Sequence, residues 1–187
     1  MSNRNVLIVL SGPSGVGKGT VAKKLVERNN NLSLSISCTT RAPRVGEING
    51  KEYFFIDKST FKEKIESDGF LEYSEHFDNF YGTPKDFVLE KLKSGDVLLE
   101  IDVNGGLQVK ESYKDAVLIM LTPPSIEEVK NRLIKRNTES MNKINGRMAR
   151  IEYELSKEKL YDYSVVNDDL IVAIEEVEQI IKNEKNK

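Results

Sequence analysis

The sequence predicts an α/β fold with a doubly wound, mainly parallel sheet, and three observations support this. Apolar runs of strand length alternate with amphipathic segments of helical spacing along most of the 187 residues. The first apolar run leads without a gap into a glycine-rich turn and a helix. Between the first two major units lies a stretch of short strands and turns, which indicates a small insert. A chain of this length suits one domain with an insert.

The first unit begins with a buried strand and ends with an amphipathic helix. Residues 6–10 are apolar throughout, as a parallel strand that is buried on both faces requires. After the turn, Val21, Leu25 and Val26 recur at helical spacing among charged residues. Strand, turn and helix therefore follow one another directly.

The turn between them has the pattern of a phosphate-binding loop. Gly12 and Gly17 are five residues apart and Lys18 follows. Such glycines let successive backbone N–H groups converge on one anion, and the helix N-terminus adds its dipole. Gly19 stands where the general pattern has a hydroxyl that binds Mg²⁺, and Thr20 carries the hydroxyl instead. A glycine-rich turn with an incidental lysine is the alternative, but the strand and helix around it favour a nucleotide-binding loop.

The predicted insert spans residues 35–83 and carries little helix. Its expected elements are a half-exposed strand at residues 34–37, a hairpin turn at Asn49 and Gly50, a strand at residues 53–56, a short helix capped by Ser59, and a strand at residues 70–77.

After residue 84 the regular alternation of helix and strand returns. The expected strands are residues 97–102, 116–121 and 164–166, and the expected helices lie around residues 87–92, near Leu107, at residues 126–133 after the capping Ser125, at residues 147–160 and around residues 171–181. The core then comprises residues 1–34 and 84–187, and the whole domain residues 4–185. A polar segment at about residues 137–146 is the expected lid.

The composition is that of an ordinary soluble globular protein, with 39% hydrophobic and 31% charged residues. A net charge of -2 gives no support to a nucleic-acid-binding surface, so anion binding is expected to be local. Cys38 is the one cysteine, which excludes an intramolecular disulfide, and the sequence has no Cys and His cluster for a metal. We expect no signal peptide and no membrane partner, and therefore a cytoplasmic protein.

Two acidic residues end a predicted strand. Glu100 and Asp102 are two residues apart and therefore point the same way. Ligands bind at the carboxyl ends of strands in open α/β sheets, and phosphate-loop enzymes place an acid there that positions Mg²⁺. The alternative is a pair of charges that emerge into solvent.

Two groups of arginines are candidates for phosphate binding. Arg132 and Arg136 are one helical turn apart, and Arg147 and Arg150 begin the next predicted helix. Like charges at such spacings repel unless an anion lies between them, and guanidinium groups suit phosphate. Each pair taken alone is more typical of a solvated face, but beside a phosphate loop the two helices resemble a lid.

A second anion site is suggested by arginines in a rigid turn. Arg41 and Arg44 bracket a proline, and the hydroxyls of Tyr53 and Tyr81 follow later in the insert. Ordinary surface charge is the alternative.

These motifs together resemble the guanylate kinase family, in the family's order along nearly the whole chain. The matching stretches are residues 11–18, 37–44, 46–47, 49–53, 70–72, 81–83, 100–102 and 166–168. The resemblance implies a nucleoside monophosphate kinase with a phosphate-binding loop, a GMP-binding insert and a helical lid. It also implies Mg²⁺-dependent phosphoryl transfer from ATP to GMP, and to dGMP as well, giving ADP and GDP.

The resemblance also implies roles for individual residues. ATP would contact Gly12, Pro13, Ser14, Gly15, Val16, Gly17, Lys18, Gly19, Thr20 and Asn167. The GMP phosphate would contact Arg41, Arg44, Tyr53 and Tyr81, and the guanine Ser37, Glu72 and Thr83, with Asp102 assisting. The catalytic set would be Lys18, Arg41, Arg132, Arg136 and Arg147, and Mg²⁺ would be held by Thr20, Glu100 and Asp102, in part through water.

Two departures from the family pattern weaken the metal assignment. Gly19 replaces a hydroxyl residue, and Glu100 stands where many members have aspartate. Separately, Arg150 has no assured counterpart in the family, so no role is assigned to it. The alternatives are a kinase of another nucleoside monophosphate and an inactive interaction domain of the same fold. Intact Lys18 and Arg41 disfavour the second.

Overall fold

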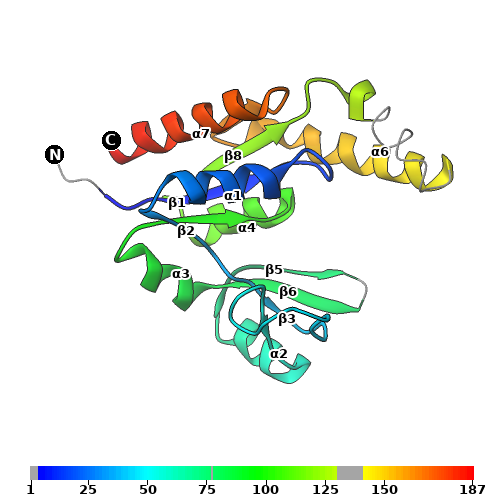
Figure 1. Cartoon of the computed structure of the whole chain (residues 1–187). Helices are drawn as coiled ribbons and strands as arrows, with labels where there is room; N and C mark the ends of the chain where they lie inside the picture. The colour runs from blue at the N-terminus through cyan, green and yellow to red at the C-terminus, as the bar shows by residue number, and fades with distance from the viewer. Residues whose placement is uncertain (1–3, 77, 130–140) are drawn as a thin grey trace.

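The computed structural model describes residues 4–76, 78–129 and 141–187, and these form two sheets (Figure 1). The larger sheet has five strands in the order β2-β7-β1-β8-β9, and every neighbouring pair is parallel. The smaller sheet has four strands in the order β4-β3-β6-β5 and mixes parallel and antiparallel pairs. The predicted fold class, a parallel α/β sheet with a small strand-rich unit, is confirmed.

The larger sheet has β1 at its centre. Its strands are β1 Leu7–Ser11, β2 Leu32–Leu34, β7 Asp96–Glu100, β8 Val117–Thr122 and β9 Tyr163–Val166. Every residue of β1 and β8 is buried, because helices cover both faces of the sheet.

Residues 126–129 are helical, and seven further helical segments have both ends within the described residues. They are α1 Lys18–Arg28, α2 Lys58–Glu66, α3 Lys85–Leu92, α4 Val103–Ser112, α6 Met141–Ser156, the 3-10 turn η1 Glu158–Leu160 and α7 Leu170–Lys185. Helices α1 and α7 bury Leu25 and Val177 in one apolar core with the sheet. Helices α3 and α4 bury Val88 and Val109 in a second core against the other face. The sheet is therefore doubly wound.

The smaller sheet has an apolar core of its own. Its strands are β3 Cys38–Thr39, β4 Phe54–Phe55, β5 Phe70–His76 and β6 Asn79–Pro84. Phe61 of α2 stacks on Phe70 and Phe80, with ring centroids 4.4 Å and 5.3 Å away. This separate core lets the smaller sheet pack as a unit below the larger one in Figure 1.

Three expectations for the insert are wrong. The strand expected at residues 34–37 is absent there, because β2 ends at Leu34 and β3 begins at Cys38. Asn49 and Gly50 form a local turn, closed by the Gly50 N–H that donates to the Tyr53 carbonyl at 2.8 Å, but β4 pairs parallel to β3 and so makes no hairpin. The N-cap of α2 is Asp57 and not the expected Ser59. The Asp57 carboxylate accepts a hydrogen bond from the Thr60 N–H.

Two boundaries in the core also differ from expectation. Strand β7 ends at Glu100, so Asp102 lies beyond the strand and caps α4. Helix α6 begins at Met141 and ends at Ser156, earlier at both ends than the expected residues 147–160. The Ser125 cap is confirmed, since its hydroxyl accepts from the Glu128 N–H at 3.0 Å. Among the described helices, none combines the length and apolar character needed to cross a membrane.

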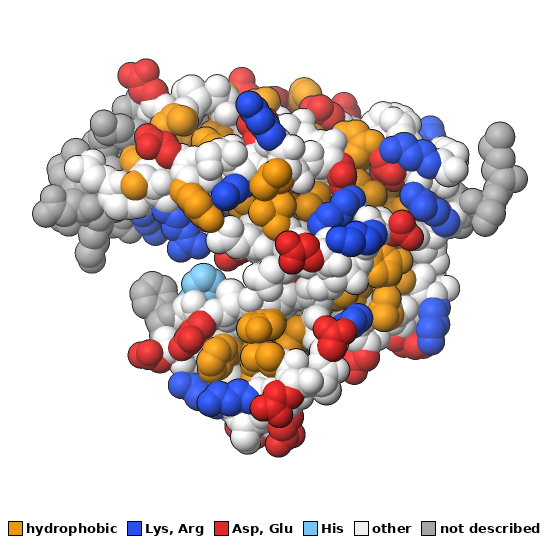
Figure 2. All heavy atoms as spheres, turned by 180° about the vertical axis from the view of Figure 1, so that it is seen from behind, with side chains coloured by type: hydrophobic (Ala, Val, Ile, Leu, Met, Phe, Trp, Pro, Cys, Tyr) orange, Lys and Arg blue, Asp and Glu red, His pale blue; other side chains and the backbone are white. Residues whose placement is uncertain are grey.

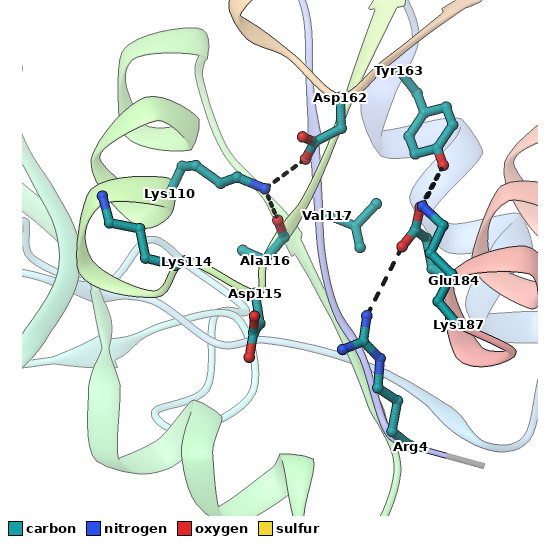
Figure 3. A pocket seen from close by; sticks show the side chains of 10 residues that line it. All are labelled: Arg4, Lys110, Lys114, Asp115, Ala116, Val117, Asp162, Tyr163, Glu184 and Lys187. Carbon is teal, nitrogen blue, oxygen red and sulfur yellow. Dashed lines mark hydrogen bonds and ion pairs between the residues drawn. The ribbon is translucent and has the colours of Figure 1, made fainter. Parts of the chain in front are cut away.

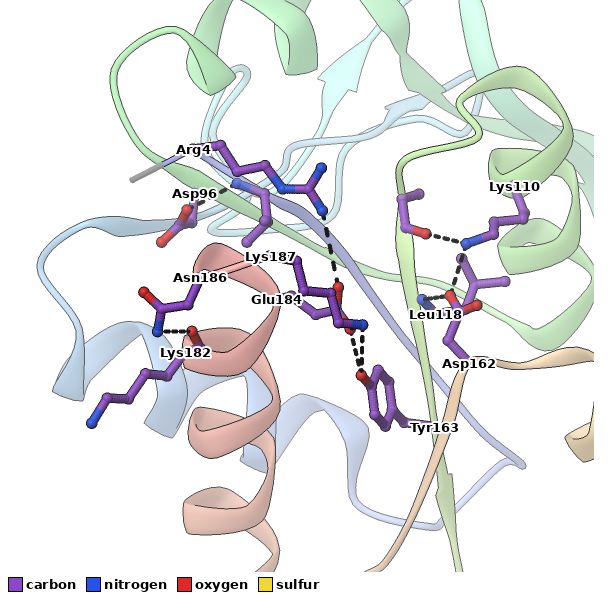
Figure 4. Close-up of polar contacts among 12 residues, drawn as sticks. Arg4, Asp96, Lys110, Leu118, Asp162, Tyr163, Lys182, Glu184, Asn186 and Lys187 are labelled. Atoms are coloured by element: carbon purple, nitrogen blue, oxygen red, sulfur yellow. Dashed lines mark hydrogen bonds and ion pairs between the residues drawn. The ribbon is translucent and has the colours of Figure 1, made fainter. Parts of the chain in front are cut away.

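A fully buried carboxylate joins four segments at one end of the larger sheet. Asp96, at the start of β7, accepts from the Val6 N–H at 3.0 Å, the Asn31 amide at 3.1 Å and the Lys185 ammonium at 2.7 Å. Figure 4 shows Asp96 near the C-terminal end of α7. Asp96 thereby ties the start of β1, the turn before β2 and the end of α7 to one another. Glu184, one residue earlier on α7, bonds Tyr163 and Lys187 in the same view.

We expect Asp96→Ala to lower the free energy of unfolding by about 3 to 5 kcal/mol, because it leaves a buried ammonium and two N–H donors without an acceptor. Urea unfolding of the full chain measures this. Asp115→Ala removes an exposed carboxylate and serves as the control. Equal stabilities of the two variants would contradict a central role for Asp96.

Candidate active site

The glycine-rich loop lies against the carboxyl ends of β8 and β9. Gly12 has φ 149°, and a Cβ added to it would lie 2.3 Å from the carbonyl oxygen of Leu121. Gly17 has φ 98° and caps α1, and a Cβ there would lie 2.7 Å from the Asn167 amide nitrogen. Only glycine combines such backbone angles with such close approach. The loop therefore presents its backbone N–H groups at the N-terminus of α1, as anion binding requires.

Lys18 folds back over this loop. Its ammonium donates to the Gly12 carbonyl at 2.6 Å and to the Pro13 carbonyl at 3.2 Å. Burial lowers the pKa of Lys18, whereas the charges of Glu154, Glu100 and Asp102 act against that change. The loop thus holds one cation close to its N–H groups.

Asn167, an expected ATP residue, is fixed to the loop. Its side-chain amide donates to the Val16 carbonyl at 2.7 Å, across 151 residues of sequence. The structure therefore brings the end of β9 and the phosphate loop together.

Six of the expected acceptor residues line two small adjoining cavities between the sheets, whereas Arg41 and Arg44 line neither. A cavity of about 160 Å³ is lined by Ser37, Tyr53, Glu72, Ser74, His76, Tyr81, Glu100, Ile101 and Asp102. A cavity of about 130 Å³ shares Ser37, Tyr53 and Glu100 with it and adds Thr83. Figure 2 shows a hollow between the two parts of the molecule, with His76, the one histidine, on its edge and Lys and Arg side chains on the opposite edge.

Glu72 is the buried carboxyl group of this site. It is 7% exposed, and its Oε1 accepts from the Thr83 hydroxyl at 2.6 Å. Burial raises the pKa of Glu72 to about 7, the Thr83 hydrogen bond opposes this, and the negative charge of Asp102 adds to it. The carboxyl group is thus fixed in position, and its charge is sensitive to what binds beside it.

Arg41 already holds a carboxylate. Its guanidinium bonds both oxygens of Glu47, at 2.9 Å and 3.0 Å, and its carbon lies 5.6 Å from the centre of the Tyr53 ring. The Glu47 hydrogen bond raises the pKa of Arg41. Arg44 is exposed and is joined to the group through its backbone N–H, which donates to Glu47 at 2.7 Å. The Arg41 guanidinium and the Arg44 backbone N–H therefore both bind the Glu47 carboxylate.

Glu100 and Asp102 both lie near the phosphate loop, but their carboxylates make different contacts. A Cβ added to Gly19 would lie 3.4 Å from Oε1 of Glu100, so this exposed carboxylate stands directly over the glycine. Asp102 uses Oδ1 to accept from the Gly105 N–H at 2.8 Å, and its Oδ2 lies 3.6 Å from Nε2 of His76. Thr20 is exposed on the first turn of α1.

The expected lid is described only in part. Arg147 is exposed on α6, and the Arg150 Nε donates to Glu154 at 3.0 Å. Arg132, Arg136 and residues 137–140 lie outside the described residues.

Three residues near the site have no role in the sequence-based prediction. His76 could have been found from strand alternation, because residues 72, 74 and 76 share one face of β5. Glu154 is acidic on an otherwise apolar helix face, a weaker signal. Tyr161 is buried, with its hydroxyl donating to the Val103 carbonyl at 2.9 Å, and nothing in the sequence indicates this.

A further cavity, of about 400 Å³, lies at the other end of the sheet (Figure 3). It opens at the starts of β8 and β9 and contains none of the expected site residues. Its charged groups largely neutralise one another: Lys110 bonds Asp162 at 2.9 Å, and Glu184 bonds Lys187 and contacts Arg4 at 4.0 Å. This cavity is therefore separate from the phosphate loop.

A glycine-rich loop after the central strand of a parallel sheet, with a polar cavity beside it, defines a nucleotide-binding protein of the phosphate-loop class. Residues 4–184 match the family model described as guanylate kinase. A guanylate kinase of Caldanaerobacter subterraneus is 50% identical over 99% of this chain and 90% of its own length. The guanylate kinase of Clostridium tetani is 51% identical over 97% of this chain and 88% of its own length.

A solved structure agrees with these relatives. The crystal structure of guanylate kinase from Anaplasma phagocytophilum superposes with a TM-score of 0.76 at 32% identity, covering 100% of this chain and 89% of that one. The chain belongs to the guanylate kinase family, so the predicted family and its kinase activity are confirmed.

The Glu72 carboxyl group predicts a pH dependence of stability. Its pKa is about 7 in the folded chain against an ordinary value of 4.5, so between these pH values the folded chain binds the extra proton. Stability contributed by Glu72 is therefore present below pH 4.5 and is lost as pH rises through 7, by about 3 kcal/mol in total.

Glu72→Gln stays neutral throughout this range. We expect its free energy of unfolding in urea, relative to the unsubstituted chain, to rise by about 3 kcal/mol between pH 4.5 and pH 8. A difference that is the same at both pH values would show that Glu72 is ionised in the unligated fold.

Proposed function

We propose that the chain transfers the γ-phosphoryl group of ATP to GMP, and also to dGMP, with Mg²⁺, giving ADP and GDP. The observation that carries the choice of acceptor is the buried Glu72 carboxyl group, held by Thr83 in a cavity that also contains Asp102. The family membership reported above supports the same reaction.

Glu72 suits guanine because of the pattern of donors on the base. Guanine presents its N1–H and its 2-amino group side by side, and one ionised carboxylate accepts from both. Adenine has no such pair of donors, so it would leave a buried carboxyl group unsatisfied. Discrimination on this basis reaches about 10⁴-fold. Ser37 and Asp102 line the same cavity and would complete the contacts to the base.

The acceptor phosphate is proposed to bind Arg41, Arg44, Tyr53 and Tyr81. The tyrosine rings are 6.1 Å apart, and Arg41 lies over one of them. Arg41 holds the Glu47 carboxylate in this structure, so a phosphate dianion would compete with that carboxylate for the same guanidinium. Planar guanidinium groups bind phosphate through two parallel hydrogen bonds.

The donor phosphates are proposed to bind the loop, residues 12–20, with Asn167 supporting its shape. A phosphate oxygen of GMP attacks the γ-phosphorus of ATP, the bond to the β–γ bridging oxygen breaks, and ADP leaves. This needs alignment and charge stabilisation rather than a covalent enzyme intermediate. Lys18 and Arg41 supply charge on the described side of the site. Arg132, Arg136 and Arg147 are proposed as the lid arginines from the sequence, and one such contact can contribute about 10³ to 10⁵ in rate.

Mg²⁺ is proposed to be held near Glu100, Asp102 and Thr20, in part through water. The donors are carboxylate and hydroxyl oxygens, the type that Mg²⁺ prefers, and they stand beside the loop. When bound, Mg²⁺ neutralises charge on the β- and γ-phosphate oxygens. Glu100 lies over Gly19, the position that lacks the usual hydroxyl, with its Oε1 3.4 Å from the point where a Cβ would stand.

The division of the chain follows from these roles. We propose that residues 1–34 and 84–187 bind ATP, that residues 35–83 bind GMP, and that the lid at about residues 137–146 closes over both. Closure would exclude water, which otherwise competes with GMP as acceptor.

The base choice is tested by ADP release with GMP, dGMP, AMP and dTMP as acceptors in the presence of Mg²⁺. We expect GMP to be used fastest, and Glu72→Gln to lower kcat/KM for GMP by about 10² or more while KM for ATP changes less than threefold. Faster turnover of AMP or dTMP than of GMP would refute the acceptor. Equal losses for both substrates would show that Glu72 lies outside the base pocket.

The loop assignment is tested by Lys18→Ala. We expect turnover to fall at least 10³-fold, because the transferred group loses its nearest cation, while the melting temperature without ligand stays unchanged. Lys23→Ala removes an exposed lysine from the same helix and is the matched control. A Lys18→Ala enzyme with a near-normal rate would refute the proposed role of the loop.

A further inference from the structure

Helix α4 contains a glycine that its backbone does not require. Gly105 lies in the first turn of α4, is buried, and is not one of the glycines with positive φ. Glycine is a poor helix former, because it loses more backbone freedom in a helix than any other residue does. The reason for a glycine at this position therefore lies in what surrounds it.

The space beside Gly105 is occupied by residues of the base cavity. A Cβ added to Gly105 would lie 3.0 Å from Oε2 of Glu72, and 3.4 Å from both Oδ1 of Asp102 and Cδ1 of Ile101. All three residues line the cavity of about 160 Å³ in which the acceptor base is proposed to bind. The contact with Glu72 is the shortest, so a side chain at residue 105 would push on its carboxyl group first.

The Glu72 carboxyl group is held from another direction as well. Its Oε1 accepts from the Thr83 hydroxyl at 2.6 Å, while its Oε2 is the oxygen that approaches Gly105. The residue is 7% exposed, so little free space surrounds it. A Cβ at residue 105 would therefore displace Oε2 and disturb the hydrogen bond with Thr83.

Strand β5 cannot easily shift to relieve such a contact, because α4 binds it on both sides of Glu72. The Ser112 hydroxyl donates to the Leu71 carbonyl at 3.0 Å. The Tyr73 N–H donates to the side-chain oxygen of Gln108 at 3.2 Å. Figure 1 shows β5 running alongside α4. An added Cβ would thus move the Glu72 side chain rather than the strand.

We propose that Gly105 is a positioning residue for the acceptor base: its missing side chain lets the Glu72 carboxyl group lie where it meets the donors of guanine. This rests on the proposed function, in which Glu72 accepts from the guanine N1–H and 2-amino group. Gly105 does not line the cavity and acts through Glu72. A displaced carboxylate would weaken two directed hydrogen bonds at once, whereas ATP at the phosphate loop would be unaffected.

The test is a double-mutant cycle on the steady-state kinetics of the full chain. We expect Gly105→Ala to lower kcat/KM for GMP about tenfold, through KM, with KM for ATP within twofold, because a misplacement of about 1 Å can cost about 10²-fold and this one is smaller. In the Glu72→Gln background the same change should lower kcat/KM less than twofold, since the displaced carboxylate is gone. A tenfold loss in both backgrounds, or in neither, would overturn the proposal.

Two further variants separate positioning from damage to the fold. Gly105→Ala should leave the melting temperature unchanged or raise it, because alanine favours a helix. In Gly106→Ala the new Cβ would lie 2.2 Å from the Tyr161 hydroxyl, which lines neither cavity. We expect this variant to lower the melting temperature and to keep KM for GMP within threefold. Glu111→Ala, which removes an exposed side chain of α4, should change neither quantity.

A loss of GMP use that follows the melting temperature in both glycine variants would overturn the proposal. Failure of the proposed function would be seen separately. Absence of turnover with GMP in both the unsubstituted chain and Glu111→Ala would refute the function itself. Normal turnover in those two, together with an unchanged KM for GMP in Gly105→Ala, would refute only the role of Gly105.

Discussion

The close approach of Gly12 to the Leu121 carbonyl is the contact on which the site depends. A side chain at Gly12 would collide with β8, and one at Gly17 would collide with Asn167 at the end of β9. The loop therefore keeps its shape only between the ends of these strands. The loop ends at the N-terminus of α1, where an anion is favoured.

Charge around the loop is balanced between different parts of the fold. Lys18 lies among three carboxylates, Glu100 from β7, Asp102 from the cap of α4 and Glu154 from α6. These acids favour the charged form of a partly buried lysine, but they also repel the phosphates that it is proposed to bind. The arginines of the insert and the lid, together with a divalent cation, offset that repulsion once substrates are present. The fold thus brings anionic and cationic groups to one place from separate elements.

Most of the core could be predicted from sequence because buried parallel strands are continuous apolar runs, and four of the five were located in this way. The parallel pairing of β4 with β3 could not be predicted from the sequence. Asn49 and Gly50 indicate a turn, but they do not indicate which strand pairs with the one that follows it. Asp96 directly precedes an apolar run, and the ammonium that pairs with it in the buried site belongs to Lys185, 89 residues away. In the site, sequence motifs predict that Glu72 and Arg41 are functional residues. The burial of Glu154 could be recognised only from the packing of α6 in the structure.

The sheet order has a consequence for synthesis of the chain. Strand β1 is made first, yet its two neighbours, β7 and β8, come from residues 96–122, and the Asn167 amide that holds Val16 comes later still. A growing chain on the ribosome therefore carries the sequence of the phosphate loop long before it can hold the loop's shape. ATP in the cell cannot stabilise these early intermediates, and a product truncated before residue 167 should lack the binding site although it contains every glycine of the motif.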